Sequence, residues 1–116
     1  MSGATASVIL YSPFTAVQTG LVSRLLHEHA SSVTETRKGR HWEFTDGASC
    51  ASLTVFETRD RPDCHESLLK AGLTDDDAPE IILIAYPLRA DRDACEKLAA
   101  VVAELLDGLN LGTAGV

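Results

Sequence analysis

The sequence predicts an α+β fold, a two-layer sandwich in which a mostly antiparallel sheet has its helices packed on one face. Three observations predict this fold. Apolar residues alternate with period two in the middle of the chain, they recur at helical spacing on both sides of it, and two short apolar runs stand apart as buried strands. The length of 116 residues suits one core, so we predict a single domain over residues 1–116 in the order β-α-β-β-β-α-β-α.

The first strand is predicted at Val8–Tyr11, an apolar run that contains β-branched residues and is ended by Pro13. A helix is expected next, because Thr15 and Gln18 have the spacing of a capping box. Apolar residues then recur at helical spacing as far as about Ala30.

A meander of three strands is predicted after this helix. Asp46–Gly47 is typical of a type I′ hairpin, and a two-residue loop there pairs Trp42 with Ala51. A second tight turn at Lys38–Gly39 extends the same apolar face, on which Trp42 points into the core. The predicted strands are Val33–Arg37, Arg40–Thr45 and Ser49–Thr58.

The second half of the chain predicts a helix over Arg61–Leu73, an acidic loop, and a central strand at Glu80–Tyr86 that is apolar almost throughout. The last helix is expected from a capping box at Asp93 to a stop at Gly108. Residues from about 110 to 116 are expected to form a flexible tail. The two apolar strands belong in the middle of the sheet.

The composition excludes several classes of protein. Seventeen acidic residues against ten basic ones, a net charge of −7, argue against a nucleic-acid-binding protein. No transmembrane run or signal peptide is visible, and three cysteines without tight spacing indicate a reducing compartment, so we expect a cytoplasmic protein. No cofactor motif occurs, and no metal site is expected, because His27 and His29 lie two apart on a helix and adjacent Cys64 and His65 also diverge.

The polar side of the meander is the candidate functional surface. Small and polar residues share it with a histidine, a carboxylate and Cys50, and a basic turn lies at its edge. The residues predicted to contact a partner are Thr34, Thr36, Arg37, Lys38, Arg40, His41, Glu43, Ser52, Thr54 and Phe56.

These features favour a small acidic protein that binds another protein. A basic toxin or a secreted effector is the kind of partner that such a chain neutralises or chaperones, as an immunity protein or an antitoxin does. The contact would show an aromatic anchor, Phe56, Trp42 or Tyr86, partly exposed. No catalytic residue is assigned.

Three alternatives stay open. A small-molecule binder or dimeric enzyme would use the polar face, with His41 as the acid or base near Glu43 or Cys50. A homodimer would form through the edge of the meander or its polar face. The order of elements also resembles that of the restriction-endonuclease-like nucleases. The metal site of that family has an Asp followed later by Glu/Asp-x-Lys on the next strand. The similar residues here are Asp46 and then Glu57-Thr58-Arg59, although arginine stands where that family has lysine and Asp46 lies at the predicted turn.

Overall fold

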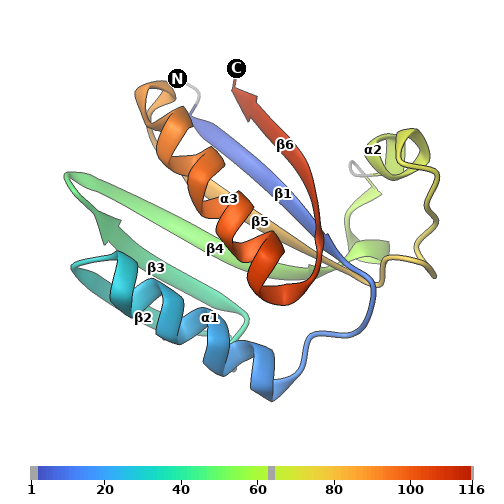
Figure 1. Cartoon of the computed structure of the whole chain (residues 1–116), viewed down its shortest axis with the longest axis horizontal. Helices are drawn as coiled ribbons and strands as arrows, with labels where there is room; N and C mark the ends of the chain where they lie inside the picture. The colour runs from blue at the N-terminus through green and yellow to red at the C-terminus, as the bar shows by residue number, and fades with distance from the viewer. Residues whose placement is uncertain (1–2, 63–64, 116) are drawn as a thin grey trace.

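A computed structural model describes residues 3–62 and 65–115 and shows one six-stranded antiparallel sheet (Figure 1). The strands lie in the order β2-β3-β4-β5-β1-β6. The main elements along the chain are β1 (Ala4–Leu10), α1 (Ala16–His29), β2 (Ser32–Thr36), β3 (His41–Asp46), β4 (Ser49–Glu57), α2 (His65–Lys70), β5 (Glu80–Tyr86), α3 (Arg92–Leu106) and β6 (Leu109–Gly115).

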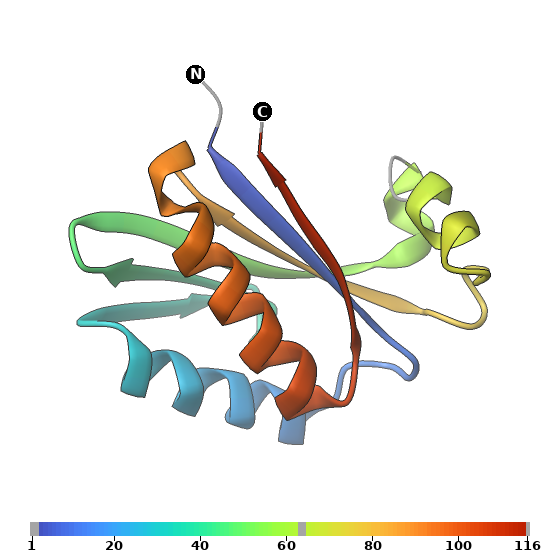
Figure 2. The same cartoon turned by 45° about the horizontal axis from the view of Figure 1, so that its top comes forward.

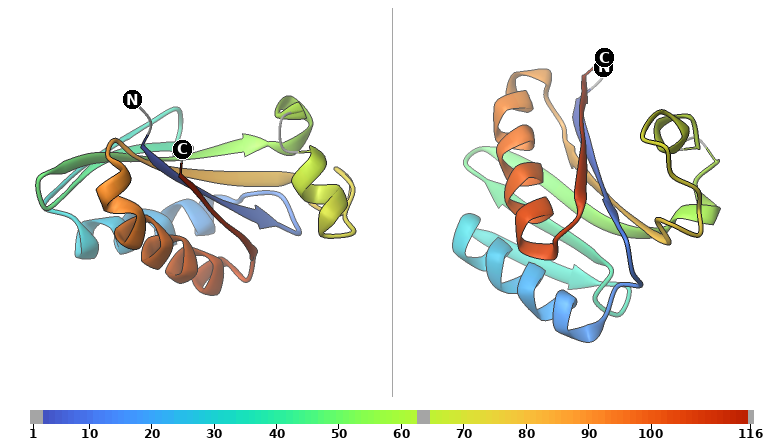
Figure 3. Two further views of the ribbon diagram at one scale, coloured as in Figure 1. Left: turned by 90° about the horizontal axis from the view of Figure 1, so that it is seen from above. Right: turned by 45° about the vertical axis from the view of Figure 1, so that its right-hand side comes forward.

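The two-layer α+β prediction is confirmed. Helices α1 and α3 cover the same face of the sheet, as the view along the sheet shows (Figure 3). Their inward residues, such as Val22 and Leu98, pack with Trp42 and Ile84 from the strands to form the main core. The two apolar strands β1 and β5 are neighbours inside the sheet, as predicted.

Helix α2 departs from the prediction in place and in length. Leu68 packs against Ile9 and Ile81, whose side chains belong to the other face, so α2 covers one end of that face. The helix spans six residues rather than Arg61–Leu73. Part of the predicted helix, Asp63 and Cys64, lies outside the described residues.

The predicted ends of the long helices are confirmed for α1 and corrected for α3. Thr15 and Gln18 form the capping box at the start of α1. The N-cap of α3 is Asp91 rather than Asp93, and its side chain makes no capping hydrogen bond. In the described part of the chain no helix is both long and apolar enough to cross a membrane.

The β3–β4 hairpin turns one residue later than predicted. Asp46 pairs with Ser49, so the two-residue loop is Gly47–Ala48 and Trp42 pairs with Leu53. Gly47 has a positive φ of 63° and Asp46 does not, whereas a type I′ turn at Asp46–Gly47 requires both. Because the partner moves by two residues, each side chain stays on its predicted face.

The β2–β3 connection keeps its predicted register but is wider than a two-residue turn. Thr36 pairs with His41, and the four residues between them form the turn, so Arg37 and Arg40 are not strand residues. Arg37 and Lys38 have φ of 53° and 55°, in the left-handed region that side chains disfavour. The turn is fastened to α1 at Gly39, whose carbonyl oxygen accepts a hydrogen bond from Thr19 Oγ1 at 3.1 Å.

The end of the chain is an edge strand, not the predicted tail. Strand β6 pairs with β1, and the register shifts between Ser7 and Val8. This strand carries no β-branched apolar residue and contains Gly112 and Gly115, which is why its sequence alone resembles a loose segment. Strand β6 pairs with the edge of β1 that β5 leaves free, and this edge exists only because of the order of the strands in the sheet.

Candidate functional site

The face of the sheet away from α1 and α3 is the candidate site, and we call it the open face. Side chains alternate between the two faces of a strand, so the neighbours of the core residues Trp42, Phe44 and Leu53 point to this side. The predicted grouping of the polar residues on one face is confirmed by the pairing of β2, β3 and β4. The open face away from α2 carries Ser32, Thr34, Thr36, His41, Glu43, Thr45, Cys50, Ser52, Thr54, Leu83 and Ala85.

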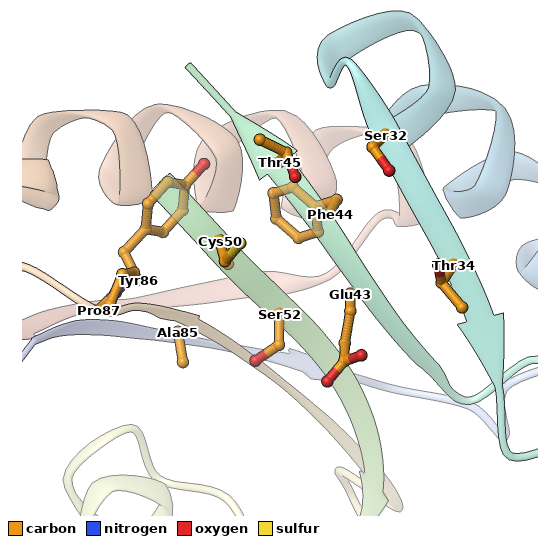
Figure 4. A pocket seen from close by; sticks show the side chains of 11 residues that line it. Ser32, Thr34, Glu43, Phe44, Thr45, Cys50, Ser52, Ala85, Tyr86 and Pro87 are labelled. Atoms are coloured by element: carbon orange, nitrogen blue, oxygen red, sulfur yellow. The ribbon is translucent and has the colours of Figure 1, made fainter. Parts of the chain in front are cut away.

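A hollow of about 510 Å³ lies on this face and spans β2 to β5 (Figure 4). Strand pairing places Thr34, Glu43, Ser52 and Ala85 in one row across its floor. Three of these four side chains are small, and exposed Cys50 lies beside them. The floor is therefore low because short side chains occupy the centre of the sheet.

Among the described residues that line the hollow, Glu43 has the only acidic or basic side chain. Its side chain is 72% exposed, so a partner can reach its carboxylate. His41 Nε2 lies 3.8 Å from Glu43 Oε1, outside the hollow. The hollow therefore presents one negative charge on a neutral floor, which suits a basic side chain better than an acidic one.

His41 lies beside Glu43 but is held away from Cys50. Its Nδ1 lies 2.7 Å from Thr54 Oγ1, and Thr54 is buried. Cys50 and Thr54 are four residues apart on β4, which is roughly 13 Å at about 3.3 Å per residue. His41 and Cys50 thus lack the short contact through which a histidine activates a cysteine nucleophile.

The three basic residues of the turn do not form one cluster. Arg37 and Lys38 are exposed, whereas Arg40 donates to both carboxylate oxygens of Glu80 at 3.2 and 2.9 Å. The hydrogen bonds that Arg40 donates to Glu80 are the main reason why the pKa of Arg40 is raised, against the opposing effect of burial. Arg40 is therefore engaged by Glu80 within the chain and does not cluster with Arg37 and Lys38, whereas its contact with a partner stays a prediction.

Of the three aromatic anchors that the binding hypothesis expects, only Phe56 is partly exposed. Trp42 and Tyr86 are buried, and the Tyr86 hydroxyl donates to Asp46 Oδ2 at 2.7 Å. The guanidinium of Arg61 lies 4.7 Å from the centre of the Phe56 ring. Phe56 also packs beside the α2 cluster, so it lies away from the hollow.

The geometry does not assemble the acidic set of the nuclease alternative. Asp46 pairs with the first residue of β4 and Glu57 is the last, eight residues away, which is roughly 26 Å along the strand. Arg59 Nε instead contacts Glu57 Oε2 at 2.7 Å. Among the described residues no three histidine, cysteine, aspartate or glutamate side chains come together as a metal-ligand set.

No protein-family model, no curated protein and no solved structure matches this chain. Sequence reasoning missed the part of the hollow that β5 and the residue after it supply, Ala85 and Pro87. The pairing of β5 with β4 brings them there, and the one available signal was a small residue, Ala85, within an otherwise bulky run.

Proposed function

We propose that this protein acts by binding another protein through the open face, with a basic side chain of the partner entering the hollow beside Glu43. The observation that carries the proposal is the hollow itself, which has a neutral floor of short side chains and a single exposed carboxylate. The net charge of −7 adds a long-range attraction for a basic partner. Neutralising a basic toxin or chaperoning a secreted effector is the role that this arrangement supports best.

Two pairs of substitutions test the proposal on partners captured from the native cells. Glu43→Lys reverses the charge in the hollow, and Glu104→Lys makes the same change on exposed α3. Ser52→Trp fills the hollow, and Ala100→Trp adds the same bulk to exposed α3. We expect Glu43→Lys and Ser52→Trp to weaken binding by at least about 30-fold, while each control stays within about threefold of wild type.

Alkylation of Cys50 gives an independent readout, because this thiol lies in the hollow and is exposed. Cys95 is buried, and Cys64 is replaced by serine in the test protein. A bound partner should slow the alkylation of Cys50 in proportion to occupancy. A partner that binds Glu43→Lys and Glu104→Lys equally well, and leaves Cys50 reactive, would refute the use of this face.

A second candidate function is the binding of a small cationic molecule in the same hollow. Its volume of about 510 Å³ lies within the range of small-molecule sites. This alternative predicts slower Cys50 alkylation by low-molecular-weight extract from the same cells, without any captured protein. Glu43→Lys should abolish that protection as well.

A further inference from the structure

The turn between β2 and β3 holds two basic residues in a backbone conformation that their side chains disfavour. Arg37 and Lys38 have φ of 53° and 55°, and Gly39 follows with φ of 81°. Glycine adopts this left-handed region freely, whereas a residue with a Cβ is strained there. Backbone strain of this kind is concentrated at functional sites.

Contacts within the chain hold the backbone of this turn but not its two basic side chains. Thr19 of α1 donates to the carbonyl of Gly39, and Gly39 is buried. The turn is thereby fixed to the first half of α1, and β2 and β3 run along this helix (Figure 2). Arg37 and Lys38 are exposed, and within residues 3–62 and 65–115 their side chains make no hydrogen bond or ion pair.

The turn joins the same two strands that form one side of the hollow in the open face. Strands β2 and β3 line the hollow at Thr34 and Glu43, which pair with each other. Thr34 and Arg37 are three residues apart, which is roughly 10 Å at about 3.3 Å per residue. One exposed carboxylate and two exposed cations therefore lie along the same pair of strands, separated by roughly 10 Å.

We propose, on the basis of the function proposed above, that Arg37 and Lys38 bind acidic side chains of the same protein partner whose basic group enters the hollow. Two neighbouring cations without partners in the described chain favour a carboxylate, which forms charge-assisted hydrogen bonds with both. Because the turn is already fixed to α1, binding costs little ordering of its backbone. The contact surface of the partner then carries a cation and an anion roughly 10 Å apart, and a surface with basic groups alone binds less tightly.

Substitutions in the turn separate the role of charge from that of strain. Arg37→Gly/Lys38→Gly removes both charges and relieves the strain, so the urea midpoint should rise by roughly 0.5 M while the acidic contact is lost. Arg37→Gln/Lys38→Gln removes the charges alone and should lose the same contact without a gain in stability. Asp107→Gly is the matched control, because Asp107 has φ of 55° at the exposed end of α3, and it should raise the midpoint without weakening binding.

Synthetic peptides serve as the probe, so that the native partner need not be known. The bipolar peptide is Ala-Arg-Ala-Ala-Glu-Glu-Ala with blocked ends, and in two companion peptides glutamine replaces either the arginine or both glutamates. Titrations followed by NMR at about 0.15 M salt should show the bipolar peptide binding at least about fivefold more tightly than the companion without glutamate. Arg37→Gln/Lys38→Gln should reduce this preference to about one. Arg24→Gln/Lys97→Gln removes two cations from α1 and α3 and should leave the preference unchanged.

The acidic contact and the basic contact in the hollow can fail separately. If Glu43→Lys does not weaken binding of the companion without glutamate, the hollow is not a site for a basic group. A preference for glutamate that Arg37→Gln/Lys38→Gln abolishes would still support the acidic contact at the turn. The proposal is overturned if the bipolar peptide shows no binding or no preference, or if the preference survives the loss of both turn charges.

Discussion

Replacing Arg40 with methionine should leave a carboxylate without its partner in the interior. The Glu80 side chain is only 5% exposed and accepts two hydrogen bonds from Arg40. The backbone N–H of Phe14 also donates to Glu80 Oε1, at 3.3 Å. Methionine keeps an unbranched apolar side chain at position 40 but removes the charge, so that one hydrogen bond must hold the carboxylate.

The expected cost of this substitution follows from the burial of the two partners. Removing one member of a buried ion pair costs about 3–5 kcal/mol. Because the Arg40 side chain is 36% exposed, water already screens part of the pair, and we expect about 2–3 kcal/mol for Arg40→Met. Glu80→Gln removes the charge and keeps the shape, while Arg40 can turn to water, so its cost should be about 1 kcal/mol.

Urea unfolding followed by Trp42 fluorescence is the assay, since Trp42 is the single tryptophan and is fully buried. With a slope of about 1.5 kcal/mol per molar urea, a loss of 2–3 kcal/mol lowers the midpoint by about 1.3–2 M. The double variant Arg40→Met/Glu80→Gln should be more stable than Arg40→Met alone, because the unpaired charge is gone. A loss under about 0.5 kcal/mol for Arg40→Met, or a double variant weaker than Arg40→Met, would refute the reasoning.

Three further predictions concern stability. Gly39→Ala should cost about 2–3 kcal/mol, because φ is +81° and the new Cβ would lie 2.5 Å from Thr19 Cγ2. Gly47 also has a positive φ, but there is open space around it, so Gly47→Ala should lower the urea midpoint by less than half as much as Gly39→Ala does. Thr58→Val should raise thermal stability by about 1 kcal/mol, because the buried Thr58 hydroxyl has no hydrogen-bond partner among the described residues, and a lower melting temperature would contradict this. Burial raises the pKa of the Cys95 thiol to about 11, so the folded state keeps a proton that the unfolded state loses above about pH 9. The free energy of unfolding should therefore fall as pH rises from about 9 to about 11. In a calorimetric pH series, the stability of the Cys95→Ala variant should fall less steeply than that of the wild type.

The sequence was informative where local pattern and tertiary structure agree. The capping box at Thr15 and the burial of Trp42 follow from spacing and alternation. The hairpin that the dipeptide Asp46–Gly47 predicts, as a type I′ turn, lies one residue later in the structure. In the structure Asp46 instead belongs to β3, where its carboxylate accepts the hydrogen bond of Tyr86.

The candidate site could be predicted only in part. Alternation along the meander placed Thr34, Glu43 and Ser52 on one face, because the side-chain period of a strand is two. The same reasoning assigned Arg40 to an exposed turn, because the sequence does not show that Glu80 lies beside it. Arg40 and Glu80 are 40 residues apart and meet because β4 lies between them, bonded to Arg40 through the Val55 N–H and paired with β5.

The sequence by itself determined the α+β class, the long helices and the face to which most strand residues point, since these depend on interactions between near neighbours in the chain. Only the tertiary structure decided the order of the strands, the pairing of β6 with β1 and the placement of α2 over one end of the open face. It also decided that small side chains from β4 and β5 lie together as a hollow and that exposed leucines of α1 and α3 border one groove. These features join segments far apart in the chain, and the free energy that brings them together comes from burial of the shared core, which no local pattern specifies.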